Sequence, residues 1–162
     1  MKLKKIFKEI AIGMTVLFIL SNIISYLRKP DLSSEQLPSA TVTLLDGSLY
    51  TLKRGKPVLL HFWATWCRVC QIEASNIETL SKEYEVLTVA VNSGENAAVN
   101  AYMEKNGLHF RVLNDENGSW AKQFHIRVFP TTFIYDAEGK LRFAEVGYTT
   151  TAGLLGRLKL IE

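Results

Sequence analysis

The sequence predicts an α/β domain, layered around a sheet and preceded by one apolar amino-terminal helix. Three observations predict this organisation. From residue 41 onward, short apolar runs alternate with segments of helical spacing, as in layered α/β proteins. Residues 10–27 carry no charge, and residues 28–40 are polar with two prolines. The 162 residues suffice for one ordinary domain and a short extension.

Composition and charge exclude several classes of protein. Hydrophobic residues make up 48% of the chain and charged residues 22%, which is typical of a globular protein rather than a disordered or fibrous one. Two cysteines are too few for a disulfide-stapled mini-protein or a four-cysteine zinc module. From residue 30 onward the chain has 13 basic and 15 acidic residues. This part of the chain therefore lacks the excess of positive charge that is typical of nucleic-acid-binding proteins.

The amino terminus has the pattern of a membrane anchor. The uncharged run 10–27 is about as long as a bilayer-spanning helix, and longer than the core of a signal peptide. Four lysines precede it, so the positive-inside rule predicts a cytoplasmic tail at 1–9 and a single pass through the inner (cytoplasmic) membrane. Residues 28–40 then form a linker, and 41–162 form the domain on the periplasmic side. The alternative is a signal peptide that is cleaved.

The domain opens with a predicted β-hairpin. Residues 41–45 and 48–52 are strand-like and flank an Asp-Gly pair at 46–47, which is typical of tight turns. The apolar run 57–63 predicts a buried central strand. Residues 67–83 follow with apolar side chains at roughly helical spacing, so a helix is expected directly after that strand.

The rest of the domain alternates strands and helices in the same way. Residues 86–91 predict a second buried strand, and 96–105 a helix that ends at Asn106-Gly107, a C-capping pair. The shorter elements that follow are a strand at 111–114, a helix at 119–125, two strands at 131–135 and 141–146 around a turn at 136–140, and a closing helix at 150–160.

A Cys-x-x-Cys pair lies between the first buried strand and the helix after it. Cys67 is expected at the helix N-terminus, where unpaired backbone N–H groups and the helix dipole favour a thiolate, the nucleophilic form. Cys70 follows one turn later, close enough to attack a mixed disulfide formed on Cys67. Arg68 adds a positive charge, and Trp66 is expected to shield one side of the sulfur from water.

A second motif, Val-Phe-Pro-Thr-Thr-Phe at 128–133, follows some sixty residues later. Pro130 cannot donate to a sheet ladder, so it is expected to leave backbone free beside the cysteines, where an extended substrate could pair with it. We therefore predict that Trp66, Phe129 and Thr131 contact the substrate. The alternative for Pro130 is an ordinary edge-strand proline. For the two cysteines the alternatives are a buried inert pair, a structural disulfide or half of a metal site.

Together these motifs resemble the thioredoxin-fold oxidoreductases over about residues 41–160. The resemblance rests on the Phe-Trp-Ala-x-Trp-Cys-x-x-Cys block, the Phe-Pro-Thr block and an Asp-Ala-Glu-Gly-Lys turn near the end. The anchor, the hairpin and the extra segment at about 94–120 resemble the membrane-tethered periplasmic branch, which includes the cytochrome c maturation thioredoxins and the suppressor-of-copper-sensitivity proteins. The resemblance implies a thioredoxin-like central mixed sheet, a cis Pro130 facing Cys67, an attacking Cys67 and a resolving Cys70.

Three positions bear on the chemistry, and the first two of them depart from the family pattern. The dipeptide between the cysteines is Arg68-Val69, in a position that tunes the reduction potential in this family. His61 stands where thioredoxins carry a buried acid, and we weigh a proton acceptor for Cys70 against a hydrogen-bonded core histidine. Glu73 stands where the tethered branch often has a glutamate near the active site; the alternative is a solvated helix face.

The function predicted is that of a membrane-tethered thiol–disulfide oxidoreductase. It would exchange the Cys67–Cys70 pair with cysteines of extracytoplasmic proteins, as a reductase, without a cofactor or a bound metal. The resemblance implies a membrane-embedded thiol reductase as electron donor. The alternatives are a disulfide-forming oxidase of the same fold, a Cu(I)-binding protein that uses the two thiolates, and a tethered interaction module with idle cysteines.

Overall fold

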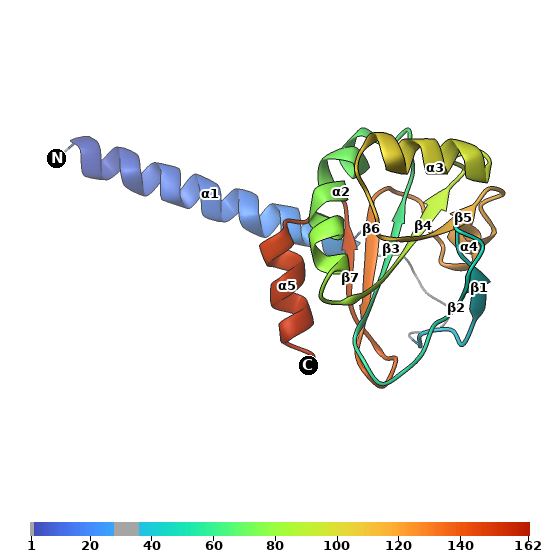
Figure 1. Ribbon diagram of the computed structural model, residues 1–162. Helices are drawn as coiled ribbons and strands as arrows, with labels where there is room; N and C mark the ends of the chain where they lie inside the picture. The colour runs from blue at the N-terminus through green and yellow to red at the C-terminus, as the bar shows by residue number, and fades with distance from the viewer. Residues whose placement is uncertain (1, 28–35) are drawn as a thin grey trace.

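A five-stranded mixed sheet forms the centre of the computed structural model, which describes residues 2–27 and 36–162, with the backbone alone at 2–6, 18, 21, 22 and 24–27. The strand order is β5-β4-β3-β6-β7, with β3 in the middle (Figure 1). The strands are β3 (Val58–Trp63), β4 (Glu85–Val91), β5 (Arg111–Asp115), β6 (Thr131–Tyr135) and β7 (Leu141–Val146). The pairs β3·β4 and β4·β5 are parallel, whereas β3·β6 and β6·β7 are antiparallel. The predicted mixed sheet is therefore confirmed.

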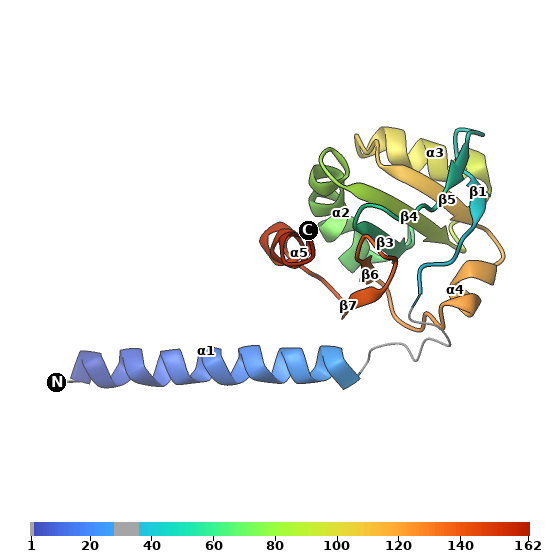
Figure 2. The same ribbon diagram turned by 90° about the horizontal axis from the view of Figure 1, so that it is seen from below.

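Helices cover both faces of this sheet, which makes β3 buried on both sides. Three helices, α2 (Arg68–Ser81), α3 (Asn96–Lys105) and α5 (Thr151–Lys159), share one apolar cluster with Leu59 and Trp63 of β3. The short helix α4 (Ser119–Gln123) and the hairpin pack on the opposite face, against Leu60 and Phe62. Figure 2 shows this separation of the helices. Alternate residues of β3 thus feed two cores, because successive side chains of a strand point to opposite faces.

The amino-terminal hairpin is present but shorter than predicted. Its strands, β1 (Thr41–Thr43) and β2 (Leu49–Thr51), form a separate two-stranded antiparallel sheet. The connecting turn is longer than the expected two residues because the Asp46 carboxylate accepts hydrogen bonds from the backbone N–H and hydroxyl of Ser48. Gly47 takes a φ of +83°, which explains the glycine at this position.

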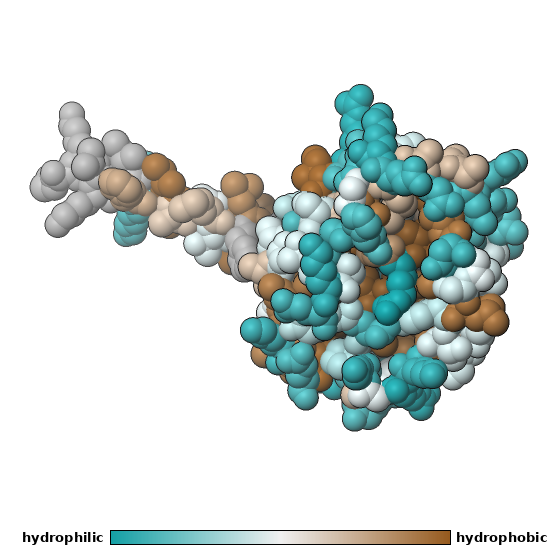
Figure 3. All heavy atoms as spheres, viewed as in Figure 1, coloured by the Kyte–Doolittle hydropathy of each residue, from teal (hydrophilic) through white to brown (hydrophobic). Residues whose placement is uncertain are grey.

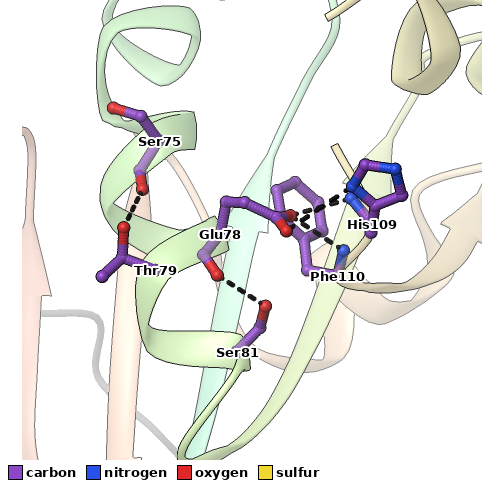
Figure 4. A network of polar contacts seen from close by, with 6 residues as sticks. All are labelled: Ser75, Glu78, Thr79, Ser81, His109 and Phe110. Atoms are coloured by element: carbon purple, nitrogen blue, oxygen red, sulfur yellow. Dashed lines mark hydrogen bonds and ion pairs between the residues drawn. The ribbon is translucent and has the colours of Figure 1, made fainter. Parts of the chain in front are cut away.

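Helix α2 is fixed to the rest of the domain at its carboxyl-terminal half by Glu78. One carboxylate oxygen of Glu78 accepts hydrogen bonds from the backbone N–H groups of His109, at 2.8 Å, and Phe110, at 3.2 Å (Figure 4). These two residues lie immediately before β5. The contact holds the carboxyl-terminal half of α2, the helix that carries Cys70, against the loop between α3 and β5.

The ordered domain begins earlier than residue 41, the boundary expected from the sequence. Gln36 forms a β-bridge with Lys140, and the backbone N–H of Leu37 donates to the carbonyl of Gly139 at 2.7 Å. Leu37 is also buried. The last part of the predicted linker 28–40 therefore belongs to the domain, and its first part, 28–35, lies outside the described residues.

The amino-terminal segment forms a helix, α1 (Lys2–Leu27), which contains the predicted membrane-spanning residues 10–27. It extends away from the sheet and its covering helices in both views (Figures 1 and 2). Among the residues whose side chains are described, no helix combines the length and the apolar character needed to cross a membrane.

Candidate active site

The two cysteines lie at the start of α2, shortly after the end of β3, and they are joined by a disulfide. Cys67 is the N-cap of α2 with an extended backbone, and its sulfur accepts the backbone N–H of Cys70 at 3.2 Å. This is the position at which a helix presents unpaired N–H groups and the positive end of its dipole. Both cysteines are buried, Cys67 with 8% and Cys70 with 2% of its surface exposed. The predicted position of Cys67 at the helix N-terminus is confirmed.

The loop before Cys67 is held by the residues that follow β4. The indole N–H of Trp66 donates to the carbonyl of Asn92 at 3.0 Å, and the backbone N–H of Thr65 donates to the Ser93 hydroxyl at 3.1 Å. Asn92 adopts a positive φ of 45°, which turns the chain at this point. Trp66 is nevertheless 59% exposed, so its ring forms an outer wall beside the disulfide.

The residues before β6 form the second wall. The Phe129–Pro130 peptide bond is cis, as the family resemblance implies, and Pro130 is buried. The ring of Phe129 lies edge-on to that of Trp66, with centroids 5.6 Å apart, and packs against the cluster that contains both cysteines. The Thr131 side chain is buried, and its hydroxyl donates to the carbonyl of Val128 at 2.8 Å. It therefore closes this loop from within and does not face outward.

The sheet position of Pro130 differs from the expected edge. Strand β6 lies between β3 and β7, so the proline precedes an internal strand and the edge-strand alternative is wrong. The carbonyl of Pro130 is already taken by the N–H of Gly147, at 2.8 Å. Within the described residues, no group hydrogen-bonds to the backbone of Phe129. The free main chain beside the cysteines is therefore that of Phe129.

Glu73 is buried one turn after Cys70, which excludes the solvated helix face. One carboxylate oxygen accepts the backbone N–H of Thr149 at 2.8 Å, and the other is buried without a hydrogen-bond partner among the described residues. Burial raises the pKa of Glu73 to about 7, although the hydrogen bond from Thr149 acts in the opposite direction. This carboxyl therefore exchanges a proton near neutral pH.

His61 lies in the middle of β3, on the face that α2 covers. The alternation of β3 places it with Leu59 and Trp63, whose cluster also contains Cys67 and Cys70. Its Nδ1 is 2.8 Å from the hydroxyl of Thr132 on the neighbouring strand. Burial lowers the pKa of His61 to about 3, so the ring is neutral at physiological pH. Its part in the chemistry stays a prediction.

Exposed apolar side chains occur on the segments that carry the cysteines, Phe129 and Thr149, and we call them the apolar rim. Arg68 and Val69, the two residues between the cysteines, are both exposed, whereas the cysteines themselves are buried. The large hydrophobic side chains of this region that remain exposed are Trp66, Val69, Ile72, Val128 and Tyr148. Such a rim is suited to contact another polypeptide. By contrast Trp63 is a core residue, packed against Tyr102 and Phe110.

Three supporting residues were not singled out from the sequence. Asn92 and Ser93 stand in an Asn-Ser-Gly run directly after a buried strand, which is a turn signature that could have marked them. Thr149 acts through its backbone N–H, so its residue type carries no signal. Across the residues that the structure describes, no three His, Cys, Asp or Glu side chains are grouped so that they could hold a metal ion.

Comparisons with known proteins agree with this site. Residues 33–144 match the model of the AhpC/TSA family. A thioredoxin-like protein of Haemophilus influenzae is 36% identical, and the match covers 100% of this chain and 98% of that protein. The thiol-disulfide oxidoreductase ResA of Bacillus thuringiensis is 32% identical over 78% of this chain and 77% of its own.

A solved structure extends the comparison to three dimensions. The exposed lipoprotein thioredoxin of Streptococcus pneumoniae superposes with a TM-score of 0.64 at 30% identity, covering 76% of this chain and 99% of that one. The resemblance drawn from the two motifs is thus confirmed over the same region. With a disulfide at the start of α2 and a cis-proline loop beside it, this chain belongs to the AhpC/TSA family of thioredoxin-like proteins.

Proposed function

We propose that this thiol–disulfide oxidoreductase is a membrane-tethered reductase of cysteine-containing proteins outside the cytoplasm. The observation that carries the exchange chemistry is the hydrogen bond from the Cys70 N–H to the Cys67 sulfur at the start of α2, whereas the reducing direction rests on the family resemblance. When the disulfide is reduced, the same N–H and the helix dipole stabilise a thiolate on Cys67. A stabilised thiolate is the form that attacks a substrate disulfide.

The reaction then passes two electrons in two exchange steps. The Cys67 thiolate attacks one sulfur of the substrate disulfide, forms a mixed disulfide with it and releases the other substrate sulfur as a thiolate. The Cys70 thiolate attacks the Cys67 sulfur, and the second substrate thiolate leaves. The substrate is reduced to a dithiol, and the Cys67–Cys70 pair is oxidised to the disulfide that the structure holds.

Cys70 must lose a proton before the second step, and Glu73 is the group proposed to accept it. Glu73 lies one turn further along α2 on the same buried side as Cys70. Its pKa of about 7 allows the carboxylate to take a proton near neutral pH and to release it again. His61 lies on the same side of β3 as Leu59 and Trp63, but its pKa of about 3 makes it a much weaker proton acceptor than Glu73, which is therefore the proposed base.

The substrate chain is proposed to bind along Phe129. An extended segment can pair its main chain with the free N–H and C=O groups of this residue, which adjoins Pro130. Trp66 and Val69 would contact the residues around the substrate cysteine, since both are exposed at the rim. Main-chain pairing tolerates many sequences, whereas the rim favours apolar residues near the target cysteine.

The tether and the electron donor are proposed from the sequence and from relatives. Residues 10–27 are uncharged and follow four lysines, which supports an anchor with the domain outside the cytoplasm. The similar protein of Streptococcus pneumoniae is described as an exposed lipoprotein. In such a compartment the oxidised pair needs a source of electrons. We propose a membrane-embedded thiol reductase, whose dithiol becomes a disulfide as Cys67–Cys70 is reduced.

The reduction potential of the Cys67–Cys70 pair tests the direction of the reaction. Equilibration of the full chain in defined glutathione or dithiothreitol buffers gives this potential directly. A reductase has a value near −270 mV, as thioredoxin has, whereas a value near −120 mV is that of a strong oxidant. A potential near −120 mV would contradict the proposed reductase and support the disulfide-forming oxidase, which uses the same exchange chemistry.

A further inference from the structure

An open pocket of about 510 Å³ lies far from the cysteines, at the opposite end of the sheet. Its wall consists of β2, the loop that joins β2 to β3, and Glu85 at the start of β4. Strand β3 begins at this end with Val58, next to Glu85, and ends beside the redox site (Figure 1). Its six residues separate the pocket from the disulfide by about 20 Å.

Three cations face this pocket without a carboxylate partner. Lys53, Arg54 and Lys56 come from the β2–β3 loop, and all three side chains are exposed. No ion pair joins any of them to another described residue; Arg54 donates only to the side-chain oxygen of Gln36, at 3.4 Å. In Figure 3 the lower end of the molecule shows hydrophilic side chains mixed with less polar ones.

The one described carboxylate that lines the pocket is already neutralised. Glu85 is 2.8 Å from the guanidinium of Arg111 and accepts the hydroxyl of Tyr50 at 2.7 Å. Beyond the pocket, the nearby turn at 136–140 adds one exposed anion, Glu138, and one exposed cation, Lys140. The pocket therefore carries a local excess of positive charge, on a body whose overall balance from residue 30 onward is slightly negative.

The same end of the domain receives the chain from its amino-terminal segment. Gln36, the first described residue of the domain, forms a bridge with Lys140 and accepts the hydrogen bond from Arg54. Leu49, which also lines the pocket, is 76% exposed although it is apolar. Exposed basic residues beside an exposed apolar side chain are typical of surfaces that bind anionic lipid headgroups.

We propose that the pocket formed by Lys53, Arg54 and Lys56 binds the phosphate headgroup of an anionic phospholipid and so docks the domain on the membrane with the cysteine pair facing away. The proposal rests on the tether proposed above, which would hold this end of the domain near the bilayer. Headgroup phosphates supply the anionic partners that the three cations do not have within the described residues. Leu49 enters the boundary between the headgroups and the acyl chains. The redox site is then presented to soluble partners and not to the lipid.

Hydrogen exchange of the full chain in lipid nanodiscs tests this docking. The discs contain either phosphatidylcholine alone or three parts of it with one part of phosphatidylglycerol. We expect the amides of residues 49–56 to exchange more slowly in the anionic discs, and this protection to vanish at high salt. The triple variant Lys53→Gln, Arg54→Gln, Lys56→Gln should lose it, with headgroup affinity lowered about fivefold for each cation removed.

A matched control separates local docking from total charge. Lys82→Gln, Lys105→Gln and Lys122→Gln together remove the same charge from exposed positions elsewhere and should leave the protection unchanged. Equal exchange in both kinds of disc, protection around Cys67 instead, or loss of protection in the control would each overturn the proposal. Protection by inorganic phosphate in uncharged discs would identify a free-phosphate site and overturn the lipid source. If the chain does not co-elute with the discs at all, the proposal that residues 10–27 anchor it in the membrane is wrong.

Discussion

The carboxylate of Glu73 accepts a hydrogen bond from the backbone N–H of Thr149, 76 residues later in the chain, at 2.8 Å. This bond joins the helix that carries the cysteines to the segment that leads into α5. It satisfies only one oxygen of the carboxyl, since the other is buried without a partner among the described residues. The combination makes Glu73 a titratable group inside the active-site helix.

Replacing Glu73 by Gln should remove a pH dependence of stability. The pKa of Glu73 rises from 4.5 to about 7 on folding, so between these values the native state binds more protons than the unfolded state. The contribution of Glu73 to the free energy of unfolding therefore falls as the pH rises through this window, by up to about 3 kcal/mol, and the difference between wild type and variant measures it. Glu73→Gln, which can still accept the Thr149 N–H, should lack this decrease. Urea unfolding of the oxidised proteins at pH 4.5 and 8 measures it. Parallel curves for the two proteins would show that folding does not raise the pKa of Glu73.

The role of His61 can be separated from its packing by kinetics. If His61 accepts a proton from Cys70, His61→Ala should slow the release of the substrate from the mixed disulfide and change the pH profile of that step. Thr132→Val is the matched control, because it removes the 2.8 Å contact to Nδ1 and leaves the imidazole in place. Rapid-quench measurements of the mixed disulfide give the rate.

A purely structural His61 predicts a different outcome. The variant would then lose stability while the release rate stays as in the wild type. The contribution of His61 to stability should also be lost as the pH falls from 6.5 toward about 3, because the lowered pKa of the buried ring means that the unfolded chain binds the extra proton first. Thr132→Val should keep that acid sensitivity, whereas His61→Ala should not.

The two cysteines should differ strongly in reactivity once the disulfide is reduced. Cys67 lies at the N-cap of α2, whereas Cys70 lies inside the helix and is more deeply buried. We expect iodoacetamide to alkylate Cys67 at least tenfold faster than Cys70 near neutral pH, because only the thiolate reacts. Mass spectrometry of peptides after timed quenching measures both rates. Equal rates would remove the case for a tuned nucleophile at Cys67.

Substrates should accumulate on Cys67 when the resolving sulfur is absent. In Cys70→Ser the first exchange step proceeds and the second cannot, so mixed disulfides persist through Cys67. Non-reducing electrophoresis followed by mass spectrometry identifies the trapped proteins, and Cys67→Ser is the control that should trap none. Trapping by the control and not by Cys70→Ser would reverse the two roles.

Local sequence patterns predicted the elements of the domain closely. The helix at 96–105 and the strands at 131–135 and 141–146 have the predicted bounds, because their periodicity and capping residues act within each segment. The prediction of the hairpin turn was less accurate. Asp46 accepts a hydrogen bond from Ser48 in a turn longer than predicted, and each strand has only three residues. Segment ends depend on such single contacts more than segment interiors do.

The order of residues along the chain determined the disulfide pair, its place between a buried strand and a helix, and the proline motif, because each of these is local. The three-dimensional packing alone decided that Glu73 is buried rather than solvated, since α5 and the Thr149 backbone arrive from the far end of the chain. It likewise decided that Pro130 precedes an internal strand, and it brought the basic loop at 53–56 beside Gln36. These relationships depend on how distant segments stack, and no periodicity or spacing within one segment encodes that arrangement.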